Sequence, residues 1–362
     1  MKAAIVTALG QGFTAADVHL ADPIGREVLV GVRASGLCHT DLTFSHNDMG
    51  VPTPMLLGHE ISGVVERVGP DVTDVAVGDH VVGCLVQYCG KCPECLSGHI
   101  YRCRHPEATL RTADQGPRLA IDGTPVTQVF GLGGFAQQAL VHEAQLVRIP
   151  DEIPFPQAAL LGCGVVTGAG SVINTAATKP GDAIVVVGAG GVGLNAISGG
   201  IVAGAATVIA VDINPGKLEL AKRCGATHTV DSTKVDPVQA VLAITGRGAD
   251  AVFDFVGIPA VTEQALAMTA DGGGLYLIGL VDPTVQFPLS PLALIMSQKR
   301  IQGVNMGSTT PRHDIPMYAN LYLEGRFNLD DLVSKTISLD EVDQGYAALA
   351  EPDIARVVIT SF

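Results

Sequence analysis

The feature that most constrains the fold is the glycine-rich stretch Gly188-Ala189-Gly190-Gly191-Val192-Gly193, which directly follows the apolar run Ala183–Val187. It matches G-x-G-x-x-G, and Asp212 ends the next apolar run 19 residues after Gly193. Such glycines let the backbone approach a pyrophosphate, whose charge the following helix N-terminus stabilises. Asp212 can bind the adenosine ribose and repels a 2′-phosphate. The stretch predicts a dinucleotide site that favours NAD over NADP, with a ligand-free glycine turn as the alternative.

Two patterns of apolar residues predict two domains in this chain of 362 residues, which exceeds the size of one comfortable core. Buried runs alternate with helical stretches in the second half, which predicts a doubly wound α/β domain of the Rossmann type. Short β signals dominate the first 150 residues and predict a barrel-like β body. From about Val304 the alternation is lost, so we expect the tail to return to the first domain. The runs are Thr207–Val211, Ala251–Phe255 and Leu275–Ile278, and the β signals are Ala3–Val6, Val28–Val32, Ile61–Val68 and His80–Val82.

Composition excludes several classes of partner. Hydrophobic residues make up 47% of the chain and charged residues 16%, as in a well-packed globular protein. With 22 Lys and Arg against 36 Asp and Glu, the net charge is −14, which opposes binding to nucleic acid or to an anionic membrane surface. No uninterrupted apolar run reaches the length of a membrane span. Eight cysteines without a secretion signal indicate a cytoplasmic protein that uses thiols for metal binding.

Four cysteines, Cys89, Cys92, Cys95 and Cys103, lie within fifteen residues. Thiols at this spacing converge when the chain wraps around a metal, and zinc held by four thiolates is the commonest case. An iron–sulfur cluster is the main rival, but its usual run ends in C-x3-C-P. Surplus core cysteines would be scattered rather than clustered. The pattern predicts a structural zinc lobe over about residues 89–103, with no open position for chemistry.

A second set of potential ligands is spread along the chain. Gly58-His59-Glu60 follows an apolar run, Cys38-His39-Thr40-Asp41 precedes it by about 20 residues, and Cys163 lies just before the α/β half. Spacing alone cannot join these sites, because a lone His or Cys is more often a core residue.

With these motifs in this order, the chain resembles the zinc-containing medium-chain alcohol dehydrogenases. The resemblance runs from Gly36-Leu37-Cys38-His39-Thr40-Asp41 through the four-cysteine cluster, Gly162-Cys163-Gly164 and the glycine loop to Arg356. It implies a GroES-like catalytic domain over residues 1–164 and 304–362 and a Rossmann coenzyme domain over residues 165–303. Two zinc ions per subunit are implied, one in the four-cysteine lobe and one at the active site.

The resemblance also implies roles for single residues. Cys38, His59 and Cys163 would hold the catalytic zinc, which polarises the alcohol oxygen while hydride passes to the nicotinamide. Thr40 would take the alcohol proton, Asp41 would orient His59, and Glu60 would lie near the metal without binding it. The remaining positions that match coenzyme contacts are His39, Thr167, Val192, Lys217 and Arg356.

Substrate and assembly are implied in the same way. Apart from Thr40, the positions that match the substrate pocket are apolar, which suits primary aliphatic or aromatic alcohols and their aldehydes. Glu107 replaces an arginine of the glutathione-linked relatives. Thr43 stands where relatives often carry a relay histidine, and His46 follows three residues later. The 31 residues between Cys103 and Phe135 resemble the long-insert, dimeric branch, so a homodimer is expected. The matching pocket positions are Thr40, Met49, Leu85, Val129, Phe130 and Leu280.

Other functions remain as alternatives. An aldehyde reductase, or an alcohol dehydrogenase that retains its NAD as some actinobacterial members do, would use the same residues. A catalytically silent NAD-binding protein would keep the glycine loop without needing Cys38, His59 and Cys163. A zinc-ribbon nucleic-acid binder would need a basic surface, which the charge opposes.

Overall fold

The computed structural model describes residues 1–281, 284–351 and 353–362, and the chain divides into two compact units. Unit 1 comprises Met1–Cys163, Thr310–Gly325 and Leu332–Phe362, and unit 2 comprises Gly164–Thr309 and Arg326–Asp331. Residues 304–309, which the sequence assigned to the first domain, lie in unit 2 because Ser308 and Gly307 bond to Thr175 and Asn174. Residues 326–331 also lie there, where Asp331 pairs with Arg223.

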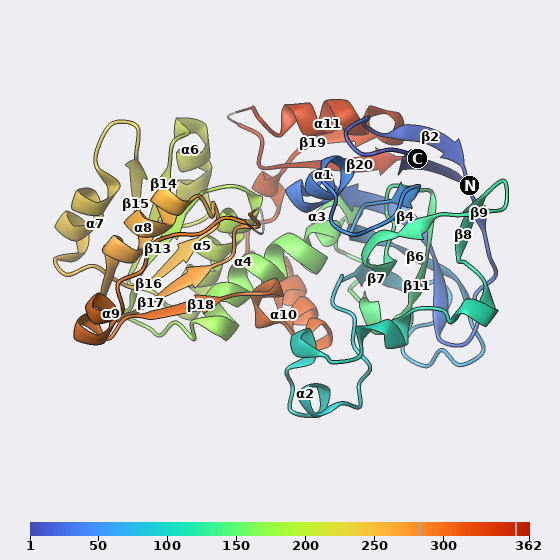
Figure 1. The fold of residues 1–362 in the computed structure, drawn as a ribbon, viewed down its shortest axis with the longest axis horizontal. Coiled ribbons are helices and arrows are strands. Elements are labelled where there is room, and N and C mark those ends of the chain that lie inside the picture. The colour runs from blue at the N-terminus through green and yellow to red at the C-terminus, as the bar shows by residue number, and fades with distance from the viewer. Residues whose placement is uncertain (282–283, 352) are drawn as a thin grey trace. The chain divides into compact units, whose positions relative to one another are not determined.

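Unit 2 is built on a parallel sheet with strand order β15-β14-β13-β16-β17-β18, and helices surround the sheet (Figure 1). This confirms the predicted doubly wound α/β fold. The strands are β13 Ala183–Val187, β14 Thr207–Asp212, β15 His228–Asp231, β16 Ala249–Asp254, β17 Thr269–Leu277 and β18 Arg300–Gly303. The helices are α4 Val166–Gly170, η7 Ser171–Thr175, α5 Gly191–Ala203, α6 Pro215–Arg223, α7 Pro237–Thr245, α8 Pro259–Met268, α9 Pro291–Ser297 and η8 Met306–Ser308.

The central strands of unit 2 are apolar throughout because both of their faces are covered. In β13 and β14, Val185, Val187, Ile209 and Val211 belong to one buried core with residues of β16 and β17. Parallel strands whose crossovers place helices on both faces have this continuous apolar pattern. The core therefore fixes the carboxyl ends of β13 and β14, where the glycine loop and Asp212 begin.

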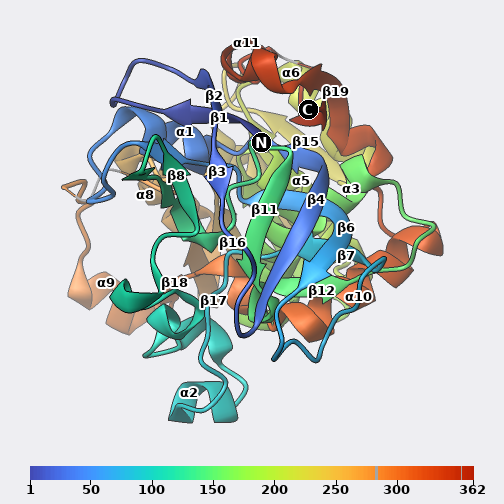
Figure 2. The same cartoon turned by 90° about the vertical axis from the view of Figure 1, so that its right-hand side faces the viewer.

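Unit 1 consists of three mainly antiparallel sheets, which confirms the predicted β body, and β4, β6 and β11 lie side by side in the largest of them (Figure 2). The sheet orders are β10-β5-β1-β2, β12-β7-β6-β4-β20-β19 with β11 on β4, and β3-β8-β9. The strands are β1 Lys2–Val6, β2 Thr14–Asp17, β3 His19–Leu20, β4 Glu27–Gly36, β5 Met55–Leu56, β6 Glu60–Val68, β7 His80–Gly83, β8 Leu119–Ile121, β9 Thr124–Pro125, β10 Thr127–Gln128, β11 Gln138–His142, β12 Leu146–Arg148, β19 Val333–Ser338 and β20 Arg356–Ser361.

Helices and short helical turns fill the connections of unit 1. The helices are α1 His39–His46, α2 Pro93–Leu96, α3 Phe155–Leu160, α10 Pro311–Leu323 and α11 Val342–Ala348. The turns are η1 Ile100–Arg102, η2 Pro106–Thr109, η3 Ala113–Gln115, η4 Val129–Gly131, η5 Glu143–Gln145, η6 Leu161–Val165, η9 Asp330–Leu332 and η10 Leu339–Glu341, of which η6 and η9 lie at the boundary with unit 2.

One helical stretch within the described residues, Phe155–Thr175, is long and apolar enough to cross a membrane by length and composition. Its most apolar window is 78% buried inside the protein, as expected for a core helix. The stretch is therefore weak support for a membrane span.

Candidate active site and metal centres

Four potential metal ligands from three distant parts of the chain converge in unit 1. The ligand atoms of Cys38, His59, Glu60 and Cys163 all lie within 4.8 Å of one another, and all four residues are buried. The His59 Nε2 atom lies 3.2 Å from the Cys163 Sγ atom. The structure thus brings together the three residues that spacing alone could not join.

Strand pairing explains how Cys38 and His59 meet. In the antiparallel pair of β4 and β6, Gly36 lies opposite Glu60. Cys38 follows the end of β4 by two residues, and His59 comes directly before β6, so both lie at the same end of the pair. The register therefore places the two side chains together although 20 residues separate them along the chain.

Cys163 reaches the same place through a close helix–strand contact. It lies in η6, a π-type turn that continues α3, and such turns often occur at functional sites. A Cβ atom on Gly162 would lie only 1.9 Å from the Gly83 carbonyl oxygen of β7. Only glycine permits this approach, and the approach carries Cys163 to the cluster.

Asp41 lies behind His59. Its Oδ2 atom is 2.9 Å from His59 Nδ1, and its Oδ1 accepts a hydrogen bond from the Gly58 backbone N–H at 3.0 Å. Burial disfavours the His59 imidazolium, but Asp41 and the Cys38 thiolate outweigh burial and raise the pKa of His59 well above its usual value. A carboxylate on one ring nitrogen leaves the other directed at the cluster.

Glu60 and Arg356 form a buried ion pair at the edge of the cluster. Arg356 Nη2 donates to Glu60 Oε1 at 3.1 Å, and both side chains are almost fully buried. Burial raises the pKa of Glu60 to about 7, although Arg356 opposes this shift. The structure thus places Arg356, which the resemblance implies as a coenzyme contact, against Glu60.

The donor set fits zinc. Two thiols and an imidazole are ligands that zinc prefers, and a hydrogen bond from Cys163 lowers the pKa of Cys38 well below its usual value despite its burial. A thiolate is therefore favoured where a cation would bind. Glu60 is paired with Arg356 through its Oε1 atom, and its buried Oε2 has no hydrogen-bond partner among the described residues.

The four lobe cysteines form a second cluster around α2 in unit 1, in a segment that extends away from the sheets (Figure 2). Their sulfur atoms lie 3.5 Å apart for Cys92 and Cys95, 3.9 Å for Cys92 and Cys103, and 4.0 Å for Cys89 and Cys95. Four sulfurs bound tetrahedrally to zinc are about 3.8 Å apart. Backbone N–H groups of Arg104 and Cys95 lower the pKa of Cys92 to about 6. The set fits a closed thiolate site.

The glycine loop of unit 2 leads from β13 into α5. A Cβ atom on Gly193 would lie 2.0 Å from the Gly188 carbonyl oxygen, whereas one on Gly190 would meet nothing within 4 Å. Gly193 therefore allows the turn to close tightly. Gly190 leaves the backbone open to a ligand at the start of α5, where no side chain caps the helix. Asp212 is fixed beside it, because its carboxylate accepts from Ala189 N at 2.7 Å and from Asn214 N at 2.9 Å. This cradle fits a dinucleotide phosphate and ribose.

The other predicted coenzyme contacts are distributed over both units. Val192 and Lys217 are half-buried on α5 and α6, close in sequence to the glycine loop and Asp212. Thr167 on α4 donates to the Met306 sulfur at 3.5 Å. His39 is exposed at the start of α1 in unit 1.

Most of the predicted substrate contacts lie in unit 1. Thr40, Met49 and Leu85 are half-buried, and Val129 is buried. The Phe130 ring lies against the His59 ring with centroids 5.5 Å apart. Leu280 lies instead in unit 2 and is 59% exposed.

Two positions bear on the predicted proton relay at the end of α1. The Thr43 hydroxyl donates to the His39 carbonyl oxygen at 3.0 Å. His46 is exposed, and its Nδ1 lies 2.9 Å from the Ser45 hydroxyl. Both side chains are thus engaged with α1 itself.

Sequence reasoning missed two neighbours of the cluster. The buried Tyr346 hydroxyl donates to the Cys38 carbonyl oxygen at 3.3 Å, and the Phe44 ring packs edge-on against Phe130 at 5.0 Å. Tyr346 lies 308 residues from Cys38, and neither residue belongs to a motif. Only the tertiary fold reveals them.

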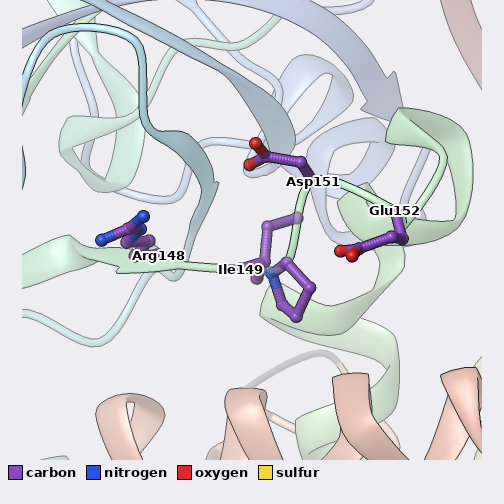
Figure 3. A pocket seen from close by; sticks show the side chains of 5 residues that line it. Arg148, Ile149, Asp151 and Glu152 are labelled. Carbon is purple, nitrogen blue, oxygen red and sulfur yellow. The ribbon is translucent and has the colours of Figure 1, made fainter.

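A shallow pocket elsewhere on unit 1 is lined by Arg148–Glu152 (Figure 3). Arg148, Asp151 and Glu152 are spread out rather than gathered at one point (Figure 3). Arg148 pairs with Asp79, and Asp151 lies 3.8 Å from His80. The pocket contains none of the predicted site residues.

Comparison with known proteins agrees with this geometry. The family described as alcohol dehydrogenase GroES-like domain matches residues 25–151, and the family described as zinc-binding dehydrogenase matches residues 191–324. An NDMA-dependent alcohol dehydrogenase from Amycolatopsis methanolica is 36% identical over 99% of this chain and 98% of its own length.

Two of the solved structures that cover the whole chain illustrate this agreement. One is an alcohol dehydrogenase zinc-binding domain protein from Burkholderia ambifaria, with a TM-score of 0.95, 37% identity and 98% of its own chain covered. The other is benzyl alcohol dehydrogenase from Acinetobacter calcoaceticus, with a TM-score of 0.94, 34% identity and 99% of its own chain covered. At this identity and coverage, the likeness extends to the family as well as the fold.

Proposed function

Because this chain belongs to the zinc-containing medium-chain alcohol dehydrogenase family, we propose that it oxidises primary aliphatic or aromatic alcohols to aldehydes, reversibly, with NAD as hydride acceptor. As a member of this family, the chain is a zinc-dependent alcohol dehydrogenase that uses a nicotinamide coenzyme and a small-molecule alcohol or aldehyde. The observation that most supports the proposal is the buried convergence of Cys38, His59 and Cys163.

We assign the catalytic zinc to Cys38, His59 and Cys163. When bound, zinc supplies a Lewis acid that polarises the substrate oxygen. Asp41 orients His59 and stabilises its charge, while Arg356 holds Glu60 in an ion pair. The three ligands therefore leave one position for the substrate. Cys89, Cys92, Cys95 and Cys103 are assigned to a second, structural zinc.

Proton transfer is assigned to Thr40. It lies in the first turn of α1, between Cys38 and Asp41, and is half-buried. Its Oγ1 hydroxyl would accept the alcohol proton while the hydroxyl's own proton moves on toward solvent. The apolar residues Met49, Leu85, Val129 and Phe130 contact the substrate carbon chain or ring, and Leu280 is assigned to the same role. With no cationic group among them, they suit an uncharged alcohol.

NAD is assigned to the glycine loop. When bound, it accepts the hydride on its nicotinamide ring. Gly188, Gly190, Gly191 and Gly193 provide backbone for the pyrophosphate, and the Asp212 carboxylate accepts from the ribose hydroxyls and repels a 2′-phosphate. Further coenzyme contacts are assigned to Val192, Lys217, Thr167, His39 and Arg356. Arg356 also forms the ion pair with Glu60.

We assign a homodimer and a cytoplasmic location. β18 is the edge strand of the unit 2 sheet, and the adjoining α9 carries exposed Leu292, Ile295 and Met296. An unpaired edge beside exposed apolar side chains is typical of a surface that another chain covers. None of the eight cysteines forms a disulfide in the described structure, as expected in a reducing compartment.

The test is an alcohol panel assayed with purified protein and NAD or NADP, followed by NADH or NADPH absorbance. Thr40→Ala should lower kcat by about 10²–10⁴-fold without changing NAD affinity, because a general acid–base group is lost. Thr43→Ala, three residues further along α1, is the matched control and should stay near wild type. Full kcat in the Thr40 variant would contradict the assigned proton transfer, and equal use of NADP would contradict the role of Asp212.

The same assay separates the alternatives. An aldehyde reductase would turn over mainly from aldehyde and NADH. A protein that retains its coenzyme would contain NAD after gel filtration and release no NADH. A silent NAD-binding protein would bind NAD without turnover of any alcohol.

A further inference from the structure

The turn that carries Phe130 has an unusual backbone. Phe130 adopts φ 54° and ψ 11°, a left-handed conformation that residues with a Cβ atom rarely adopt. Its ring packs edge-on against both His59 and Phe44, with centroids 5.5 Å and 5.0 Å apart. The turn therefore directs an aromatic ring onto a residue of the proposed metal site. Such a backbone conformation persists only when surrounding contacts stabilise it.

Gln145 makes the bonds that hold this turn. Its side chain is fully buried, and its Nε2 donates to the Phe130 carbonyl oxygen at 2.8 Å and to the Cys84 carbonyl oxygen at 3.2 Å. The backbone carbonyl oxygen of Gln145 accepts a hydrogen bond from Cys84 N at 2.8 Å. Cys84 directly precedes Leu85, so one amide group joins two segments that carry proposed substrate contacts.

The surroundings of Gln145 indicate that its amide is not there for packing alone. Its Oε1 has no hydrogen-bond partner within the part of the chain that the structure describes, although it is buried. A buried unpaired oxygen is unfavourable, and the two bonds that the Nε2 donates to the Phe130 and Cys84 carbonyl oxygens offset this cost. Gly131 leaves room for this amide, because a Cβ atom there would lie 2.8 Å from Gln145 Oε1.

Resting on the proposed function, we propose that Gln145 is a positioning residue for substrate specificity. By joining the Phe130 and Cys84 carbonyls, it fixes the turn of Phe130, whose ring lies against His59, relative to the segment that carries Leu85. A ring held in this fixed orientation offers a flat apolar contact, which favours flat aromatic alcohols over small aliphatic ones. Gln145 itself does not touch the reacting atoms.

The test compares benzyl alcohol with ethanol in wild type and Gln145→Leu. The variant keeps approximately the same volume but loses both hydrogen bonds, so kcat/KM for benzyl alcohol should fall about tenfold, mainly through KM, while ethanol changes less than about twofold. Zinc content and NAD affinity should be unchanged. Gln137→Leu is the matched control, because the Gln137 side chain accepts a hydrogen bond from Lys2 N instead. In this variant, the ratio of kcat/KM for benzyl alcohol to kcat/KM for ethanol should equal that of wild type.

A double-mutant cycle distinguishes the positioning of Phe130 by Gln145 from a general loss of stability. Phe130→Ala should lower the benzyl-to-ethanol ratio by itself, and adding Gln145→Leu should lower it little further, because Gln145 acts through Phe130. If Gln145→Leu does not fold, Gln145→Asn takes its place, since the shorter side chain cannot reach both carbonyls.

The two levels of the proposal fail differently. A wild-type ratio in a folded Gln145 variant, or effects of the two variants that simply add, would overturn this inference alone. A wild-type protein that oxidises no alcohol with NAD would instead overturn the proposed function.

Discussion

The two ligand clusters of unit 1 differ in how the chain builds them. The lobe cysteines lie within fifteen residues, in and around the short helix α2, and their cluster of potential ligands consists of four thiols. Cys38, His59 and Cys163 come from three separate parts of the chain, are buried and lie beside Asp41, Glu60 and Arg356. A local cluster can hold itself together once metal binds, whereas a dispersed one exists only in the folded domain.

This difference predicts a division of labour. Four thiolates would close the lobe site, so a metal bound there would contribute to folding and have no position for a substrate. With Cys38, His59 and Cys163 as ligands, the dispersed site would leave one position for the alcohol, and its charged neighbours would shift the pKa values of the ligands. Loss of one cluster should therefore affect activity, and loss of the other should affect stability.

The largest expected effect is on activity. Cys163→Ser should lower kcat/KM by about 10³-fold, because the Lewis acid contributes several kcal/mol to the transition state. Metal analysis should show the loss of one zinc and retention of the other. Cys224→Ser, which removes a buried cysteine of unit 2 outside both clusters, is the control and should keep activity. Full activity in the Cys163 variant would contradict the proposal that the dispersed cluster serves catalysis and the lobe cluster serves stability.

The next effect is on stability. Cys103→Ala should lower the melting temperature by several degrees, about 5–10 °C, and reduce solubility, because it opens a closed site whose metal contributes to folding. The kcat of the folded fraction should stay within about twofold of wild type, since no lobe residue touches the substrate. Calorimetry and active-site titration measure the two quantities. An unchanged melting temperature would show that metal does not hold the lobe.

A smaller effect tests the surroundings of the dispersed cluster. Asp41→Asn keeps an acceptor for Gly58 N but removes the charge beside His59, so zinc affinity or activity should fall about 10–100-fold. Lobe zinc should be retained, as followed by competition with a chromophoric chelator. Equal weakening of both zincs would indicate a general loss of stability instead.

The sequence predicts the lobe cluster more fully than the dispersed cluster, because the two differ in how close their ligands lie along the chain. The lobe follows directly from C-x2-C-x2-C spacing, because all four ligands are close along the chain. Likewise, the glycine loop and Asp212 follow from apolar runs that the parallel sheet confirms. The dispersed cluster could be assembled only through family resemblance, since no periodicity joins residues 38, 59 and 163.

The residues that refine the site are beyond sequence reasoning. The pairing of Arg356 with Glu60, the Tyr346 bond to Cys38 and the Gln145 bonds to Phe130 all join positions far apart in the chain. Each depends on the register of strands or on a turn with unusual backbone angles. These contacts are consequences of the complete fold, and no local pattern signals them.

The most direct test of the account is the zinc content of each cluster during controlled chelation. Elemental analysis of the purified protein should find about two zincs per chain, since two ligand sets of different openness are present. Treatment with a mild chelator should remove one zinc in step with loss of alcohol oxidation, while the lobe zinc and the melting temperature are largely kept. One zinc per chain with full activity, or activity that survives removal of the exchangeable zinc, would contradict the account.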